Sequence, residues 1–253
     1  MGVALYASAL AASGDPGAMP YTPYVGAQFD EADDVRMIDH VDPEHVLRYL
    51  KRGLDKPTGG VTWKHRTFDD AAALSAAVAD ELMAGRIVGW YQGRAELGPR
   101  ALGNRSILIR PDDLQLAARL SRSVKDRAPF RPYAFSITAG DAPSVIELSA
   151  AQLRMNRWMQ YAVPVKKARA QQLAAAMHVD GTTRVQICYA DENPGFHALL
   201  AAFGARFGLG AVLNTSFNAG GYPIVSTPAE ALSMFARTDM DALALNRTLV
   251  WKA

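Results

Sequence analysis

The sequence has little cysteine and no long uninterrupted apolar run. A single cysteine, Cys188, among 253 residues excludes an intramolecular disulfide framework and suits a reducing compartment. No basic segment followed by an apolar run and a cleavage site opens the chain, and no apolar stretch is long enough to cross a bilayer. These absences predict a cytoplasmic protein that is not embedded in a membrane.

Several common catalytic signatures are also missing. The five histidines are scattered without metal-ligand spacing, so the sequence leaves any metal site unknown. It contains no G-x-x-x-x-G-K-[ST] phosphate loop, no G-x-S-x-G nucleophile elbow and no G-x-G-x-x-G dinucleotide fingerprint. With 49% apolar and 21% charged residues, the chain has the composition of an ordinary globular protein of one or two domains.

The hydrophobic pattern predicts an α/β domain with a mixed, twisted sheet and flanking helices. Strand-like runs at 86–91, 106–109, 133–138, 163–165, 184–189, 211–213 and 242–245 alternate with helical stretches, among them 168–177, 194–207 and 228–237. We place this domain at 67–253. Residues 1–66 are too loosely patterned to form a core of their own, and we expect a helical and extended segment that lies against a larger body.

Positive charge is concentrated in one part of the chain. Residues 85–131 contain ten Lys or Arg and four Asp or Glu, a net charge of +6, whereas the whole chain carries only +2. The remaining residues therefore carry 17 basic and 21 acidic groups. Such concentration is more typical of a binding surface than of general solubility.

Three groups of residues in the sequence suit anion binding. The first is the arginine loop, residues 92–106, in which Arg94, Arg100 and Arg105 alternate with glycine and proline. The second is Lys125 with Arg131, framed by two prolines. The alternative interpretation of the first group is a solvated basic loop without a ligand. The alternative for the second group is a charged helix end that meets a turn.

The third group, 214–218, follows a short apolar strand and offers Asn214 and Ser216 as neutral donors, although such residues also form turns. A fourth stretch, 178–184, adds Arg184 and Asp180; this acid could approach a metal but is more typical of a turn. Arginines, one lysine and neutral donors, without a nucleophile and base pair, predict a site that positions anions. Phosphoryl or nucleotidyl transfer fits that description, whereas covalent acyl chemistry does not.

Five separate stretches resemble the C-terminal domain of the O-carbamoyltransferases that modify nodulation factors, cephalosporins and aminoglycosides such as tobramycin. These stretches are 92–106, 125–133, 178–186, 213–218 and 222–228, in that order, and the resemblance covers residue 67 to the end. It implies a YrdC-like fold, shared with threonylcarbamoyl-adenylate synthases. It also implies that carbamoyl phosphate and ATP, with Mg²⁺, are converted to carbamoyl-adenylate and pyrophosphate.

The resemblance assigns carbamoyl phosphate and anion contacts to Arg100, Lys125, Arg131 and Ser216, and implicates Arg184 and Asn214 around the nucleotide and the reacting group. Arg94 and Arg105 of the arginine loop are further candidates for nucleotide binding.

Complete members of that family carry an N-terminal ASKHA-type domain with an iron site, which transfers the carbamoyl group to an acceptor hydroxyl. Only residues 1–60 resemble the tail of that domain, in stretches 4–7 and 24–26, without the iron ligands. We therefore expect iron only in a separate ASKHA-type transferase subunit on which the opening segment docks. A truncated gene is the other interpretation, and the acceptor cannot be read from this chain.

Two rival functions differ in what they bind. A threonylcarbamoyl-adenylate synthase for tRNA modification would share the fold and use threonine and bicarbonate. A noncatalytic RNA-binding subunit would use the basic stretch with Trp90, Tyr91, Phe130 and Tyr133 as a stacking surface. The near-neutral overall charge weakens the RNA-binding interpretation.

Overall fold

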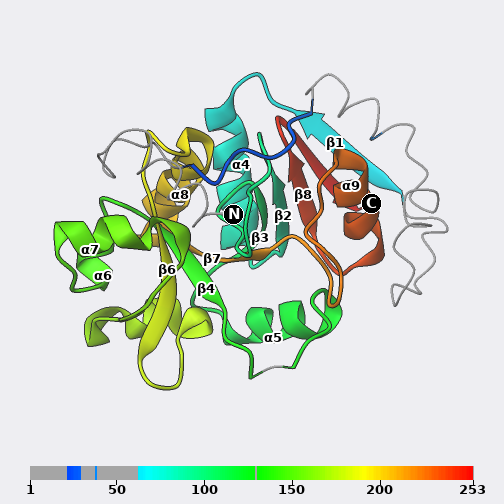
Figure 1. The fold of residues 1–253 in the computed structure, drawn as a ribbon. Coiled ribbons are helices and arrows are strands. Elements are labelled where there is room, and N and C mark those ends of the chain that lie inside the picture. The colour runs from blue at the N-terminus through cyan, green and yellow to red at the C-terminus, as the bar shows by residue number, and fades with distance from the viewer. Residues whose placement is uncertain (1–21, 30–37, 39–61, 129, 253) are drawn as a thin grey trace, which may run out of the picture.

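The computed structural model describes residues 22–29, 38, 62–128 and 130–252, and these form one mixed sheet with helices on both faces (Figure 1). The strands are β1 (Trp63–Thr67), β2 (Val88–Tyr91), β3 (Arg105–Ile109), β4 (Ala134–Thr138), β5 (Ala162–Pro164), β6 (Thr182–Cys188), β7 (Ala211–Ser216), β8 (Ala242–Leu245) and β9 (Thr248–Lys252). Their order in the sheet is β1-β9-β8-β2-β3-β7-β4-β6-β5. Only β2 with β8 and β4 with β6 pair in parallel. The α/β fold with a mixed sheet is therefore confirmed.

The described helices are α4 (Ala71–Met83), α5 (Leu114–Ser123), α6 (Ala142–Val145), α7 (Ala150–Met155), α8 (Pro194–Phe207) and α9 (Pro228–Arg237), with 3-10 helices η2 (Asn156–Trp158) and η3 (Lys167–Ala176). Side-chain N-caps begin five of these α-helices, α4 and α9 among them. The Asp70 side chain accepts from the Ala73 N–H at 2.7 Å before α4, and Thr227 with Glu230 forms a capping box at the start of α9. None of these helices is long and apolar enough to cross a membrane.

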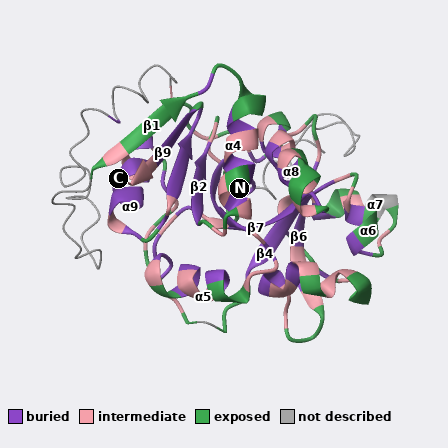
Figure 2. Ribbon diagram, turned by 180° about the vertical axis from the view of Figure 1, so that it is seen from behind, coloured by how far each residue is buried: buried purple, intermediate pink, exposed green. Residues whose placement is uncertain are grey.

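Two hydrophobic layers cover the sheet, and alternation along the strands fills both. In β3, Ile107 faces the layer that contains residues of α5 and α9, whereas Leu108 faces the layer built with α4 and α8. Figure 2 shows the central strands buried between the helices. Cys188 is free and buried in the second layer, as expected of a small core residue.

Two features differ from the sequence prediction. The expected α-helix at 168–177 is the 3-10 helix η3, which is interrupted at Leu173. The Ala175 N–H near its end donates to the carbonyl of Pro111 instead of continuing a helical ladder. In addition, β1 pairs with β9, so the sheet starts at Trp63 and crosses the expected boundary at 67.

The opening segment is described only in part. Residues 22–29 form backbone hydrogen bonds with residues 95 and 97 of the arginine loop, so this part does lie against the larger body of the same chain. The rest of the helical and extended segment expected at 1–66, apart from residues 38 and 62–66, lies outside the described residues.

Candidate functional site

The arginine loop between β2 and β3 is shaped by a carboxylate that sequence reasoning missed. Glu96 Oε1 accepts hydrogen bonds from the backbone N–H groups of Leu102, Asn104 and Arg105 at 2.8, 2.7 and 3.2 Å. Gly103 adopts a φ of +101°, and a Cβ there would lie 2.1 Å from the Phe196 ring. The loop therefore has a fixed path, which places Arg100 at its exposed turn.

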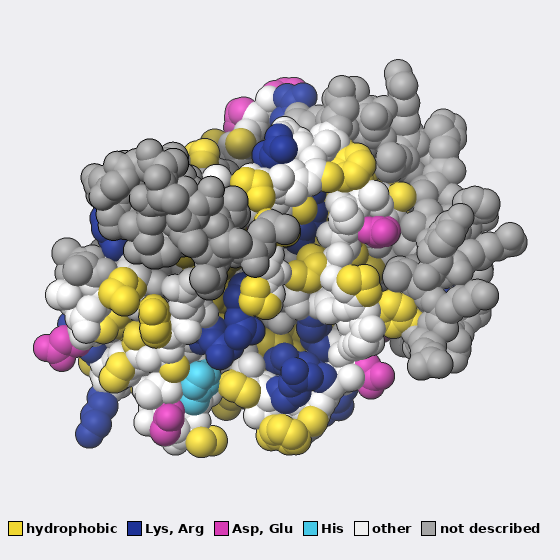
Figure 3. Space-filling model, viewed as in Figure 1, with side chains coloured by type: hydrophobic (Ala, Val, Ile, Leu, Met, Phe, Trp, Pro, Cys, Tyr) yellow, Lys and Arg dark blue, Asp and Glu magenta, His cyan; other side chains and the backbone are white. Residues whose placement is uncertain are grey.

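A pocket of about 240 Å³ opens beside this turn, at the ends of several strands. It is lined by Pro99, Arg100, Ala101, Arg127, Arg131, Pro132, Tyr133, Ala134, Met159, Arg184, Asn214, Thr215 and Ser216. We call it the arginine pocket. Four of these residues are arginines and none is acidic. Figure 3 shows Lys and Arg side chains gathered in the lower centre of this face of the molecule.

Sheet register explains why distant residues meet here. Asn214 of β7, Ala134 of β4 and Arg184 of β6 stand opposite one another on three neighbouring strands. Side chains in such a row project from the same face of a sheet. Because Ala134 is small, it leaves space between the amide of Asn214 and the guanidinium of Arg184.

The charge of the arginine pocket is not neutralised by the described residues. None of the ion pairs in the described part of the chain includes Arg100, Arg127, Arg131 or Arg184. Partial burial, with the nearby charge of Arg184, lowers the pKa of Arg100. The pocket is consequently complementary to a multiply charged anion.

Asn214 supplies a neutral polar group to the pocket. Its Nδ2 donates to Ser136 Oγ at 2.9 Å, and Ser136 Oγ donates to Gln186 Oε1 at 2.7 Å. Asn214 Oδ1 is buried and has no hydrogen-bond partner among the described residues. Buried polar atoms are normally paired, so this unpaired oxygen, on a residue that lines the pocket, is a candidate for a ligand contact.

Lys125 contacts Ser216, which lines the arginine pocket, but Lys125 itself is not part of the pocket lining. Its Nζ donates to the carbonyls of Ser216 and Asn218, both at 2.7 Å, and to their side-chain oxygens at 3.2 and 2.7 Å. Burial, with the charges of Arg127 and Arg131, lowers the pKa of Lys125 to about 7. The lysine thus holds the turn that presents Ser216.

Arg127 is a pocket residue that the sequence prediction left out. Its guanidinium lies 3.9 Å from the centre of the Tyr133 ring, and its Nη2 donates to the carbonyl of Arg131 at 3.2 Å. The spacing of Lys125 and Arg127 gave a signal for it, since both come from the same short basic stretch. Arg127 fixes the backbone that carries Arg131.

Two predicted nucleotide-binding arginines are not in the pocket lining. Arg105 is fully buried, stacks 3.6 Å from the Tyr91 ring, and donates to the carbonyls of Gln92 and Gly93 at 2.7 and 3.1 Å. Arg105 lies where the loop meets β3 and its side chain turns inward, so it does not line the arginine pocket. Arg94 is exposed and outside the lining.

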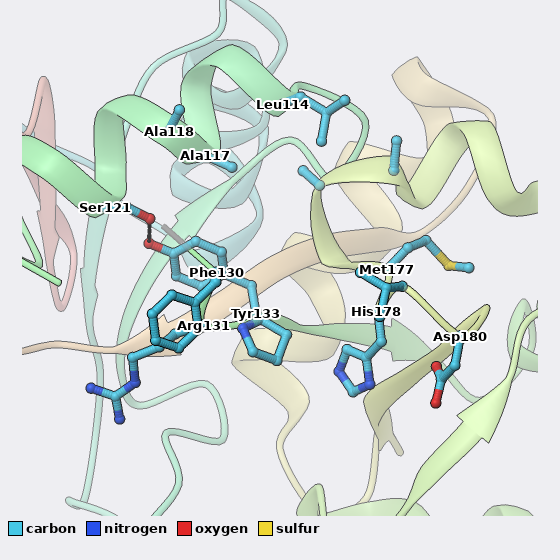
Figure 4. A pocket seen from close by; sticks show the side chains of 14 residues that line it. Leu114, Ala117, Ala118, Ser121, Phe130, Arg131, Tyr133, Met177, His178 and Asp180 are labelled. Atoms are coloured by element: carbon cyan, nitrogen blue, oxygen red, sulfur yellow. Dashed lines mark hydrogen bonds between the residues drawn. The ribbon is translucent and has the colours of Figure 1, made fainter. Parts of the chain in front are cut away.

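A second, larger pocket adjoins the first across the chain from Arg131 to Tyr133 (Figure 4). We call it the apolar groove. It has a volume of about 470 Å³ and lies between α5 and the segment that follows η3. Leu114, Ala117 and Ala118 form one wall, and Met177 and His178 stand on the other. In Figure 4 the guanidinium of Arg131 points away from these walls.

Polar atoms at the groove are few. His178 Nδ1 lies 3.1 Å from Thr182 Oγ1, whereas its Nε2 is buried without a partner among the described residues. Asp180 accepts from the N–H and hydroxyl of Thr182 within its own turn. No group of three or more His, Cys, Asp or Glu that could hold a metal occurs within 22–29, 38, 62–128 and 130–252.

Residues 79–252 match the family described as Carbamoyltransferase C-terminus, and the chain belongs to that family. The nodulation protein NolO of Bradyrhizobium diazoefficiens is 40% identical over 179 residues, which cover 71% of this chain and 32% of NolO. The 3'-hydroxymethylcephem-O-carbamoyltransferase of Streptomyces clavuligerus is 39% identical over 153 residues, 60% of this chain and 27% of that enzyme. The chain thus spans about a third of the length of such relatives.

A solved structure supports the fold. The crystal structure of P. abyssi Sua5 complexed with L-threonine superposes with a TM-score of 0.51 and 12% identity, over 70% of this chain and 47% of that chain. At this identity the likeness concerns the fold alone, and it agrees with the YrdC-like architecture expected from the sequence.

Proposed function

We propose that this chain converts carbamoyl phosphate and ATP into carbamoyl-adenylate, for O-carbamoylation of a hydroxyl group on a small molecule or natural product. The observation that carries the proposal is the arginine pocket, which gathers four guanidinium groups and no carboxylate around a polar amide. Membership of the carbamoyltransferase family supports the choice of carbamoyl phosphate among possible anions.

The proposed chemistry needs one water molecule for its atoms to balance. Water cleaves carbamoyl phosphate into carbamate and inorganic phosphate. A carbamate oxygen then attacks the α-phosphorus of ATP, and the bond from that phosphorus to the bridging oxygen of pyrophosphate breaks. Both steps release phosphate anions whose charge the guanidinium groups of Arg100, Arg131 and Arg184 stabilise without accepting a proton.

The apolar groove suits the nucleoside part of ATP. It shares Arg131, Pro132 and Tyr133 with the arginine pocket, so a ligand with an anionic end and a flat, less polar end can extend across both. Its apolar walls and single unpartnered imidazole nitrogen are typical of a pocket for a planar ligand with a few polar atoms. We assign the phosphates to the arginine pocket and the nucleoside to the groove.

A resident metal ion is not part of this proposal. The pocket presents guanidinium, amide and hydroxyl groups, which do not fit a dedicated magnesium site. In our proposal, Mg²⁺ arrives bound to the phosphate oxygens of ATP.

Transfer of the carbamoyl group to the final acceptor requires a further domain, which we place in the two thirds of the relatives' length that this chain does not match. We propose that a separate ASKHA-type subunit supplies it, together with any iron, and that the opening segment of this chain docks on that subunit. Co-expression with such a subunit tests the docking, and a chain that stays monomeric and never binds it contradicts this part of the proposal.

The activity is tested by measuring pyrophosphate release from ATP by the purified chain. We expect release that depends on carbamoyl phosphate, and release that instead needs threonine and bicarbonate would contradict the proposal. Arg131→Ala should lower the rate by about 100-fold or more, the typical cost of removing an electrostatic contact in an active site. The matched control is Arg122→Ala, because Arg122 is exposed on α5 outside the pocket and should leave the rate unchanged.

A further inference from the structure

The described part of the opening segment forms a strap against the arginine loop. Residues 22–29, blue in Figure 1, make three backbone hydrogen bonds with the loop: Gly26 N–H to the Ala95 carbonyl, Ala95 N–H to the Ala27 carbonyl, and Leu97 N–H to the Pro23 carbonyl, at 2.9, 3.0 and 2.7 Å. A Cβ at Gly26 would lie 2.7 Å from the Ala95 carbonyl oxygen. The backbone of the strap is therefore in direct van der Waals contact with the backbone of the loop, without space for a side chain at Gly26.

Tyr24 of the strap contacts residues in the interior of the domain. Its hydroxyl donates to the carbonyl of Leu102 at 2.8 Å, and the same carbonyl accepts from Gln186 Nε2 at 2.8 Å. Its ring meets that of Trp158 edge to face, with centroids 6.2 Å apart. Burial raises the pKa of Tyr24, so its hydroxyl keeps the proton that it donates.

The groups that Tyr24 contacts lead to the arginine pocket. Tyr24 and Trp158 pack on a small cluster of Leu102, Ala134 and Met159, and the last two line the pocket. Met159 has a φ of +54°, which costs a non-glycine residue energy and needs support from its surroundings. Leu102 lies two residues after Arg100, on the loop that carries it.

We propose that Tyr24 is a positioning residue of the arginine pocket. It does not line the pocket; it fixes the carbonyl of Leu102 and the backbone at Met159, and so sets the distance between Arg100 and the residues opposite it. This inference deepens the proposed function, because it rests on the arginine pocket as the anion site. It also gives the strap a role within this chain in addition to any docking.

The test compares Tyr24→Phe and Tyr24→Ala with the wild-type chain, and uses inorganic pyrophosphate as the probe in titration calorimetry. Phe keeps the ring packing and loses one neutral hydrogen bond, so we expect about threefold to fivefold weaker binding. Ala loses both, and we expect binding weaker by roughly tenfold or more. Tyr161→Phe is the control, because Tyr161 is 48% exposed and outside the pocket, and its binding should match wild type.

A purely structural role is separated by measuring unfolding of each variant alongside. If Tyr24 positions the pocket, its variants should remain folded and bind pyrophosphate more weakly. They should also show a higher KM for carbamoyl phosphate at a nearly unchanged kcat. Wild-type affinity in Tyr24→Phe and in folded Tyr24→Ala overturns the inference, and so does a wild-type chain that binds no pyrophosphate. If Tyr24→Ala does not fold, Tyr24→Phe alone decides. Binding that depends on Tyr24 without any turnover would instead contradict only the proposed carbamoyl-adenylate activity.

Discussion

Replacement of Glu96 by Gln tests how the arginine loop is held. The carboxylate accepts three backbone N–H groups through a single oxygen, and its second oxygen is buried with no partner among the described residues. Glutamine has nearly the same shape and keeps one acceptor. The substitution therefore removes charge while it leaves the volume of the side chain almost unchanged.

The expected cost follows from those contacts. Hydrogen bonds to a charged acceptor are about twice as strong as neutral ones, and a neutral bond contributes about 1 kcal/mol net. Loss of the charge should thus lower the free energy of unfolding by roughly 3 kcal/mol for three donors. Glutamine also places an N–H₂ group at the buried position of Oε2, which adds to the cost.

Urea unfolding and pyrophosphate titration measure the two consequences. Glu96→Gln should unfold at a lower denaturant concentration and bind pyrophosphate about tenfold more weakly, because Arg100 loses its fixed loop. Glu147→Gln removes an exposed carboxylate from outside the pocket and should change neither value. A Glu96→Gln chain with wild-type stability and affinity would show that the carboxylate does not organise the loop.

Two further substitutions probe the lysine that supports the turn at Ser216 and the lining of the arginine pocket. The pKa of Lys125 is about 7 in the folded chain and near 10.4 in the unfolded chain. Between these pH values the unfolded state binds more protons than the folded state. The free energy of unfolding should therefore rise with pH in that window, by at most about 1.4 kcal/mol per pH unit. Lys125→Met should remove this part of the slope in urea unfolding at pH 7.5 and 9.5, and equal slopes in the two proteins would refute the assigned environment. Ala134→Val adds two methyl groups to the pocket floor while it suits a strand, so pyrophosphate affinity should fall at nearly unchanged melting temperature. Undiminished affinity would mean that the ligand does not reach this floor.

Much of the fold could be predicted from local signals. Asp70, Thr227 and Glu230 mark helix starts through side-chain caps that depend only on neighbouring residues, which is why such starts can be predicted from the sequence. Periodicity also located most central strands. The edge strand β1 was missed, because it pairs with β9, nearly 190 residues away in the sequence; β9 was missed as well, although it follows β8 after two residues.

Parts of the site depended on contacts that local pattern does not encode. Asn214 to Ser216 were expected after a strand, yet they belong to β7, since pairing with β3 and β4 outweighs the low strand propensity of Asn214. Arg105 looked the same as Arg100 in the sequence, and only the strand that begins at Arg105 turns it into the core. Glu96 gave no sequence signal, because its role is defined by N–H groups on a folded loop.

The most direct test of the central claim is isotope exchange between labelled pyrophosphate and ATP. If the arginine pocket forms carbamoyl-adenylate and releases pyrophosphate, the purified chain should incorporate label into ATP only when carbamoyl phosphate is present, and Arg131→Ala should lose the exchange. Exchange that proceeds equally well without carbamoyl phosphate, or no exchange by a chain that binds both ligands, would contradict the account.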